Sequence, residues 1–169
     1  MADVAAFLAA RLKARGAVID ARLAETAALL HDVDKSFPLE DPRRAAGHGR
    51  AGAAWLADQG WGDLAGPVGG HPVGRLLDHE GEAPGWLARL PLEALVVAYA
   101  DKRAAQHLEP MRARFARWRA DHPDRDGQLA RAWIRAEELE QYLCDAAGIA
   151  PGGVRRLRWA GRAVARARR

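Results

Sequence analysis

Cysteine is almost absent from this chain of 169 residues, which contains only Cys144. A single thiol excludes an internal disulfide, so a reducing cytoplasm is the expected location. Long apolar runs are also lacking, since none approaches the roughly 20 residues that a membrane-spanning helix needs. The first residues, MADVAAFLAARLKARG, show no basic start before their apolar part and no cleavage site. We therefore expect neither a signal peptide nor a membrane partner.

β-Branched and aromatic residues are sparse, and the aromatic ones make up only 7% of the chain. Alanine, arginine and leucine dominate instead, which favours helices over strands. Apolar residues account for 49% and charged residues for 28%, a balance typical of a globular protein. The length suits one domain with a hydrophobic core of its own.

Acidic residues are missing from the last segment, residues 151–169, which carries seven arginines. The preceding 150 residues hold 19 Lys and Arg against 22 Asp and Glu, a net charge of −3. The overall charge of +4 is therefore a property of this basic segment, which Pro151, Gly152 and Gly153 separate from the rest as a hinge. Its arginines and Trp159 could contact the phosphates of a nucleic acid, although a solvated helix face or a frayed terminus is the more common explanation of such a segment.

Apolar residues recur at helical spacing along most of the chain. The spacing predicts helices over residues 4–14, 19–32, 42–60, 91–106, 109–123 and 126–148, with a short element and a turn over the glycine-rich residues 61–70. Repeats and hairpin signals are not found. The predicted fold class is all-α: a single-domain helical bundle with a core over residues 1–105, further helices over 106–150, and the basic segment 151–169.

Five polar residues stand where apolar helices meet their polar ends. They are His31, Asp32, His48, His71 and Asp101. Imidazole nitrogen and carboxylate oxygen are ligands of borderline divalent metals, and metal ions would offset the cost of burying Asp32. Each segment lies on a different predicted helix, which is how a bundle builds a central metal site. Taken singly, each histidine also suits a packed core position, and Asp101 suits a surface helix end; only the ordered set favours a metal site.

The order of these segments resembles the HD-domain superfamily of metal-dependent phosphohydrolases. The segments AALLHDVDK, GHGRAGAAWL, GGHPVGRL and VVAYADKR are similar to the family's successive ligand segments, and the match covers about residues 1–105. The resemblance implies an HD-type bundle. Within the superfamily, the additional histidines resemble the two-metal members, which include bacterial hydrolases of diadenosine tetraphosphate.

One feature departs from the family pattern, because the family begins with a ligand histidine about 30 residues before the His-Asp pair. No histidine precedes His31 in this chain. Two alternatives follow: the true protein has a histidine shortly before Met1, or this protein lacks that ligand and holds one of two metals weakly or not at all.

The resemblance implies that His31, Asp32 and Asp101 bind one metal, and that Asp32, His48 and His71 bind the other. Iron, manganese, cobalt, nickel or zinc would suit this ligand set better than magnesium alone. Two metals roughly 3.5–4 Å apart would activate water for attack on a phosphoryl group. The expected substrate is a phosphorylated small molecule, most simply a nucleotide. Lys35, Arg75, Lys102 and Arg103 are the candidate phosphate contacts, and each also suits ordinary solvated surface.

Two other functions fit the same residues. The first is a di-iron oxygenase on the HD scaffold, which needs nearly the same ligands; Lys35 favours phosphate chemistry over it. The second is a non-catalytic HD scaffold that binds a nucleotide, or a nucleic acid through residues 152–169. The sequence leaves the oligomeric state open.

Overall fold

The computed structural model describes residues 1–105 and 107–155, and these form the all-α fold that the composition predicts. No strand occurs within these two ranges. Seven α-helices follow in order: α1 (Ala2–Ala14), α2 (Ala21–Leu30), α3 (Arg50–Asp58), α4 (Gly62–Gly70), α5 (Leu92–Arg103), α6 (Met111–Asp121) and α7 (Asp126–Ala147). Short 3₁₀ turns connect them: η1 (Val33–Ser36), η2 (Pro42–Ala46), η3 (Val73–His79), η4 (Trp86–Arg89), η5 (Pro123–Arg125) and η6 (Pro151–Arg155).

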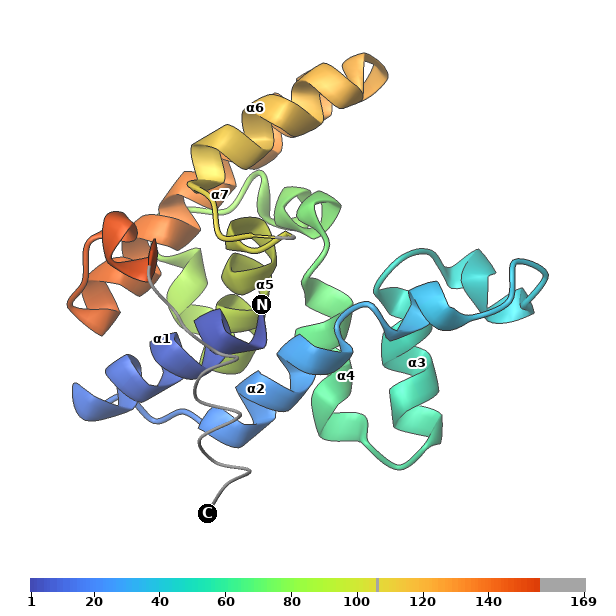
Figure 1. Cartoon of the computed structure of the whole chain (residues 1–169), viewed down its shortest axis with the longest axis horizontal. Helices are drawn as coiled ribbons and strands as arrows, with labels where there is room; N and C mark the ends of the chain where they lie inside the picture. Colours follow the sequence, from blue (N-terminus) through green and yellow to red (C-terminus); the bar gives the residue numbers. More distant parts are fainter. Residues whose placement is uncertain (106, 156–169) are drawn as a thin grey trace.

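Helix α5 lies at the centre of the bundle, as Figure 1 shows, and packs against α1, α2, α4 and α7. The composition of α5 explains this position, because residues 95–100 are mainly apolar on every side of the helix and all of them are buried. A helix that is hydrophobic all round needs neighbours on all faces. Helices α3 and α4 form one antiparallel pair beside it, and α6 and α7 form another (Figure 1).

Two sequence predictions of helix boundaries were wrong. The expected single helix over residues 42–60 is interrupted, because Gly47 and Gly49 adopt φ values of +84° and +79°, which break the helical path between η2 and α3. The glycine-rich residues 61–70 were expected to form a short element and a turn. They form the complete helix α4 instead, whose Leu64 and Val68 are buried in the core.

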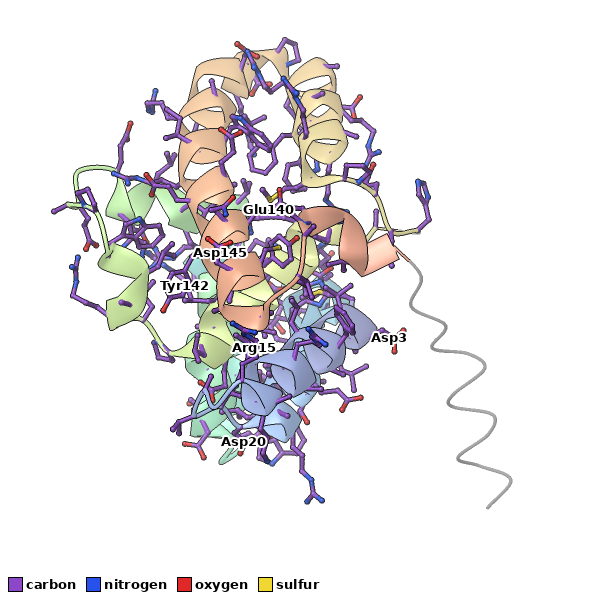
Figure 2. The ribbon with its side chains drawn as sticks, turned by 90° about the vertical axis from the view of Figure 1, so that its left-hand side faces the viewer. Asp3, Arg15, Asp20, Glu140, Tyr142 and Asp145 are labelled. Atoms are coloured by element: carbon purple, nitrogen blue, oxygen red, sulfur yellow. The ribbon has the colours of Figure 1, made fainter. Side chains whose placement is uncertain are left out.

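The carboxyl end of α7 is fixed to α1 by two arginines. Arg11 donates to the backbone oxygens of Ala147 and Gly148 at 3.3 and 3.2 Å, and Arg15 donates to that of Ala146 at 3.1 Å. Figure 2 shows Arg15 at this helix end. These carbonyls have no partner within the helix, and the helix dipole favours a cation there. The contact therefore joins the two ends of the described chain.

The core continues past residue 150, since Val154 of η6 is fully buried in the same hydrophobic cluster. The Arg-rich residues 156–169, to which the proposed nucleic-acid contact mostly belongs, lie outside the described residues. In residues 1–105 and 107–155, no helix combines the length and apolar character needed to cross a membrane.

Candidate metal centre

The five predicted ligands lie at helix ends or in the turns that follow them. His31 is the residue that ends α2, and Asp32 follows it directly. His71 ends α4 in the same way, and Asp101 belongs to the last turn of α5. His48 lies in the short loop before α3. Apolar helices can thus point at the core while their polar ends meet at one place.

The five side chains converge around the carboxylate of Asp32. Its Oδ1 lies 3.4 Å from Nε2 of His48 and 3.7 Å from Nε2 of His71, and its Oδ2 lies 3.2 Å from Nε2 of His31. The same nitrogen of His31, Nε2, lies 3.9 Å from Oδ1 of Asp101. Asp32 therefore stands between two groups of ligands, with His48 and His71 on one side and Asp101 on the other.

The second nitrogen of each imidazole is already engaged by an acceptor. Nδ1 of His31 lies 2.9 Å from the backbone oxygen of Ala28, and Nδ1 of His71 lies 2.6 Å from that of Val68. A carbonyl oxygen only accepts hydrogen bonds, so Nδ1 carries the proton in both rings. In the neutral rings, Nε2 then presents a lone pair toward Asp32.

In the neutral rings with Nδ1 protonated, these lone pairs face one another. Nε2 of His71 lies only 3.1 Å from Nε2 of His48, and the two rings are nearly perpendicular, at 83°. Two imidazole lone pairs and a carboxylate at this separation repel one another unless a cation lies among them. The donor set of three nitrogens and two carboxylates therefore fits divalent transition metals, with Asp32 placed to bridge two ions.

The charge of Asp32 is stabilised by its neighbours even without a metal. Burial alone would raise the pKa of this carboxyl. When a proton rather than a metal occupies Nε2 of His31 and His71, these rings donate to the carboxylate, and together with Lys35 they hold its pKa well below its usual range. Nζ of Lys35 lies 2.7 Å from Oδ2. Asp32 is therefore a permanent anion, as a bridging ligand must be.

Comparison with known families supplies the observation that decides the family. The model of the HD domain matches residues 1–106, which is well over half of the chain. The chain belongs to the HD domain family. Its HD segment contains all five clustered residues, and the expected match over residues 1–105 is confirmed. No significant match was found among curated proteins or solved structures.

Asp34 also belongs to this cluster of side chains, and the sequence reasoning missed it. Its side chain is only 6% exposed, and its Oδ2 accepts from the backbone nitrogen of Gly49 at 2.8 Å and lies 3.1 Å from Nδ1 of His48. The carboxylate thus orients His48, whose ring is otherwise 42% exposed, and leaves Nε2 free for the metal. A carboxylate two residues after the His-Asp pair was the only signal in the sequence.

Lys102 and Arg103 do not lie where a substrate could touch them, contrary to the expectation. Lys102 is fully buried and donates to the backbone oxygens of His71 and Ala98 at 2.7 and 3.0 Å. Burial lowers its pKa to about 8. Arg103 is 3% exposed and donates to the hydroxyl of Tyr99 and the backbone oxygen of Glu109. The prediction was based on their position next to Asp101 in the sequence, but both side chains are buried, whereas Asp101 lines a cavity.

Arg75 is also placed away from the cluster. Its Nη1 pairs with Asp78 at 2.6 Å, and it lines a separate, largely apolar cavity of about 220 Å³ that Trp86 and Leu95 also line. Lys35 is the one predicted phosphate contact that lines the cavity at the metal ligands.

A second cavity, of about 390 Å³, opens at the cluster itself. Lys35, His48 and Asp101 line it from the HD segment, and Arg114 and Trp118 line it from α6. Its size is in the range of ligand-binding pockets. Arg114 was not among the predicted phosphate contacts, because its neighbours in the cavity belong to segments distant in the sequence.

Proposed function

We propose that this protein is a metal-dependent phosphohydrolase that cleaves a phosphate ester or anhydride of a nucleotide-like substrate. The observation that carries the proposal is the convergence of three imidazole lone pairs on Asp32 at the mouth of a cavity with cationic side chains. The family consists in general of metal-dependent hydrolases, which supports the reaction class.

The residues present would hold two ions in the arrangement expected from the family. His31, Asp32 and Asp101 would bind one, and Asp32, His48 and His71 the other. When bound, such ions activate water for attack and offset the negative charge of a phosphoryl group. Asp32 bridges, and Asp34 and Lys102 hold His48 and His71 in place through hydrogen bonds.

Lys35 would supply the first contact with the substrate. Its side chain is 62% exposed and pairs with Asp32 at the edge of the cavity. An ammonium group in this position would be able to donate to a phosphoryl oxygen bound in the cavity. The cavity would hold one nucleotide-sized group, which leaves the second half of a dinucleotide outside it.

The proposal is tested on protein loaded separately with Mn, Fe, Co, Ni or Zn. Phosphate release is measured over nucleoside mono-, di- and triphosphates and dinucleotides, with oxygen consumption measured in parallel for the oxygenase alternative. We expect metal-dependent phosphate release and no oxygen uptake. Oxygen uptake without phosphate release would overturn the proposal.

Asp32→Ala is expected to abolish both metal binding and turnover, because the bridging ligand is lost. Asp58→Ala, an exposed position on α3, is the matched control and should behave as the wild type. An Asp32→Ala protein that keeps its metal and its activity would contradict the assignment of the site. A ligand histidine encoded before Met1 stays a prediction, which the upstream codons would test.

A further inference from the structure

Arg114 carries buried hydrogen-bond donors that lack a partner within the part of the chain that the structure describes. The residue lies on α6, outside the matched HD segment of residues 1–106, and lines the cavity at the metal centre. Its side chain is 12% exposed, yet Nε and Nη1 are buried with no hydrogen-bond partner among residues 1–105 and 107–155. A guanidinium has five N–H donors, and leaving buried donors unsatisfied is unfavourable.

The nearby carboxylates do not satisfy this guanidinium. Nη2 of Arg114 lies 3.7 Å from Oδ1 of Asp101, and Nη1 lies 3.9 Å from Oε1 of Glu109, both beyond hydrogen-bond distance. Glu109 is engaged elsewhere, since it accepts two bonds from Arg117, at 2.7 and 2.5 Å. Asp101 belongs to the ligand cluster. The guanidinium therefore lies close to the metal centre, and its Nε and Nη1 make no hydrogen bond to the described residues.

Trp118 contacts this guanidinium with the face of its ring. Cζ of Arg114 lies 4.7 Å from the centre of the indole ring, one helical turn further along α6. The indole in turn meets the buried ring of Phe115 edge to face, with 5.1 Å between the ring centroids. Stacking on a ring that is itself packed limits the orientations of the arginine and prepares it for a planar contact.

An anion with several acceptor oxygens beside the metals would complete these bonds. A phosphoryl group has that geometry, since a guanidinium binds two of its oxygens in parallel. We propose that Arg114 binds a phosphoryl oxygen of the substrate across the cavity from Lys35, and that Trp118 positions its guanidinium for that contact. The proposal rests on the proposed phosphohydrolase function and deepens it, because a residue outside the HD segment then takes part in substrate binding.

Direct binding of inorganic phosphate to the manganese-loaded protein tests the role of Arg114. Calorimetry compares the wild type with Arg114→Gln and Arg114→Lys, and with Arg112→Gln, an exposed arginine on the same helix, as the matched control. We expect Arg114→Gln to weaken phosphate binding roughly 10- to 100-fold, as loss of a charged hydrogen bond does. The phosphate affinity of Arg114→Lys should lie between those of the wild type and Arg114→Gln, and that of Arg112→Gln should match the wild type. Equal phosphate affinity in the wild type and Arg114→Gln overturns the proposal.

Two further measurements separate this contact from a structural role. Manganese affinity and melting temperature are measured for each variant, and Arg114→Lys carries the test if Arg114→Gln unfolds. A phosphate affinity that falls only in proportion to manganese affinity overturns the proposal. Trp118→Leu should weaken phosphate binding in the wild type but not in Arg114→Gln, and equal losses in both backgrounds would refute the positioning role of Trp118.

A negative result for Arg114 can be told apart from a failure of the proposed hydrolase function. A metal-loaded wild type that releases no phosphate from any substrate tested would overturn the hydrolase, while the phosphate affinities of the wild type and Arg114→Gln would still test the contact. Conversely, an active wild type whose phosphate affinity does not depend on residue 114 would leave the hydrolase intact and overturn this inference.

Discussion

Asp34 provides the sharpest test of how the metal centre is organised. Its carboxylate is buried and joins two neighbours, the backbone nitrogen of Gly49 and the ring of His48. Because a carboxylate only accepts, it keeps the proton of His48 on Nδ1 and leaves Nε2 for the metal. Replacement of Asp34 therefore acts on stability through Gly49 and on metal affinity through His48.

Two substitutions separate these effects. Asp34→Ala leaves the buried N–H of Gly49 without a partner, which costs about 1–3 kcal/mol of unfolding free energy. It also frees His48, and loss of such a supporting group costs roughly 10- to 100-fold in metal affinity. Asp34→Asn keeps one oxygen for Gly49, so the protein should be more stable than Asp34→Ala. Its amide nitrogen donates, however, which favours the other tautomer of His48 and should weaken metal binding at least as much.

The assays are urea unfolding in the presence of EDTA and titration of the metal-free protein with Mn²⁺ or Co²⁺. Glu40→Gln, an exposed carboxylate in the loop before η2, is the control and should change neither quantity. Wild-type metal affinity in Asp34→Asn would refute the tautomer argument. Complete loss of metal binding in both variants would also refute it, because Asp34 would then be a ligand rather than a support.

Two further predictions concern the loop of His48 and the attachment of α7. Alanine at Gly49 would place a Cβ 2.7 Å from Cγ of Pro72 at a φ of +79°, whereas alanine at Gly47, with a φ of +84°, would meet no atom within 4 Å. Metal titration should therefore show a larger loss of metal affinity for Gly49→Ala than for Gly47→Ala. Equal losses would contradict the clash with Pro72. Tyr99→Phe removes the hydroxyl that donates to Glu140 at 2.8 Å and accepts from Arg103 at 2.5 Å. Urea unfolding should therefore show a loss of about 1–2 kcal/mol of unfolding free energy, with metal affinity unchanged. An unaltered unfolding free energy would show that this network does not stabilise the bundle.

The sequence by itself determined the class of fold and the order of the ligands. Helical spacing and a shortage of β-formers were enough to predict helices close to α1, α2, α5, α6 and α7, because these features depend on residues near one another in the chain. The His-Asp pair and the later histidines could be found in the same way. Glycine was the weak point, since a pattern of apolar residues does not show whether Gly47 breaks a helix or Gly66 continues one.

Only the tertiary structure decided what surrounds each charged side chain. Lys102, Arg103 and Arg114 are all basic residues on helices, and spacing alone gave no reason to separate them. Packing places Lys102 beneath His71, Arg103 against Tyr99, and Arg114 beside Asp101 at the cavity. The physical reason is that burial and partners are set by segments distant in the sequence, whereas periodicity describes only one helix at a time.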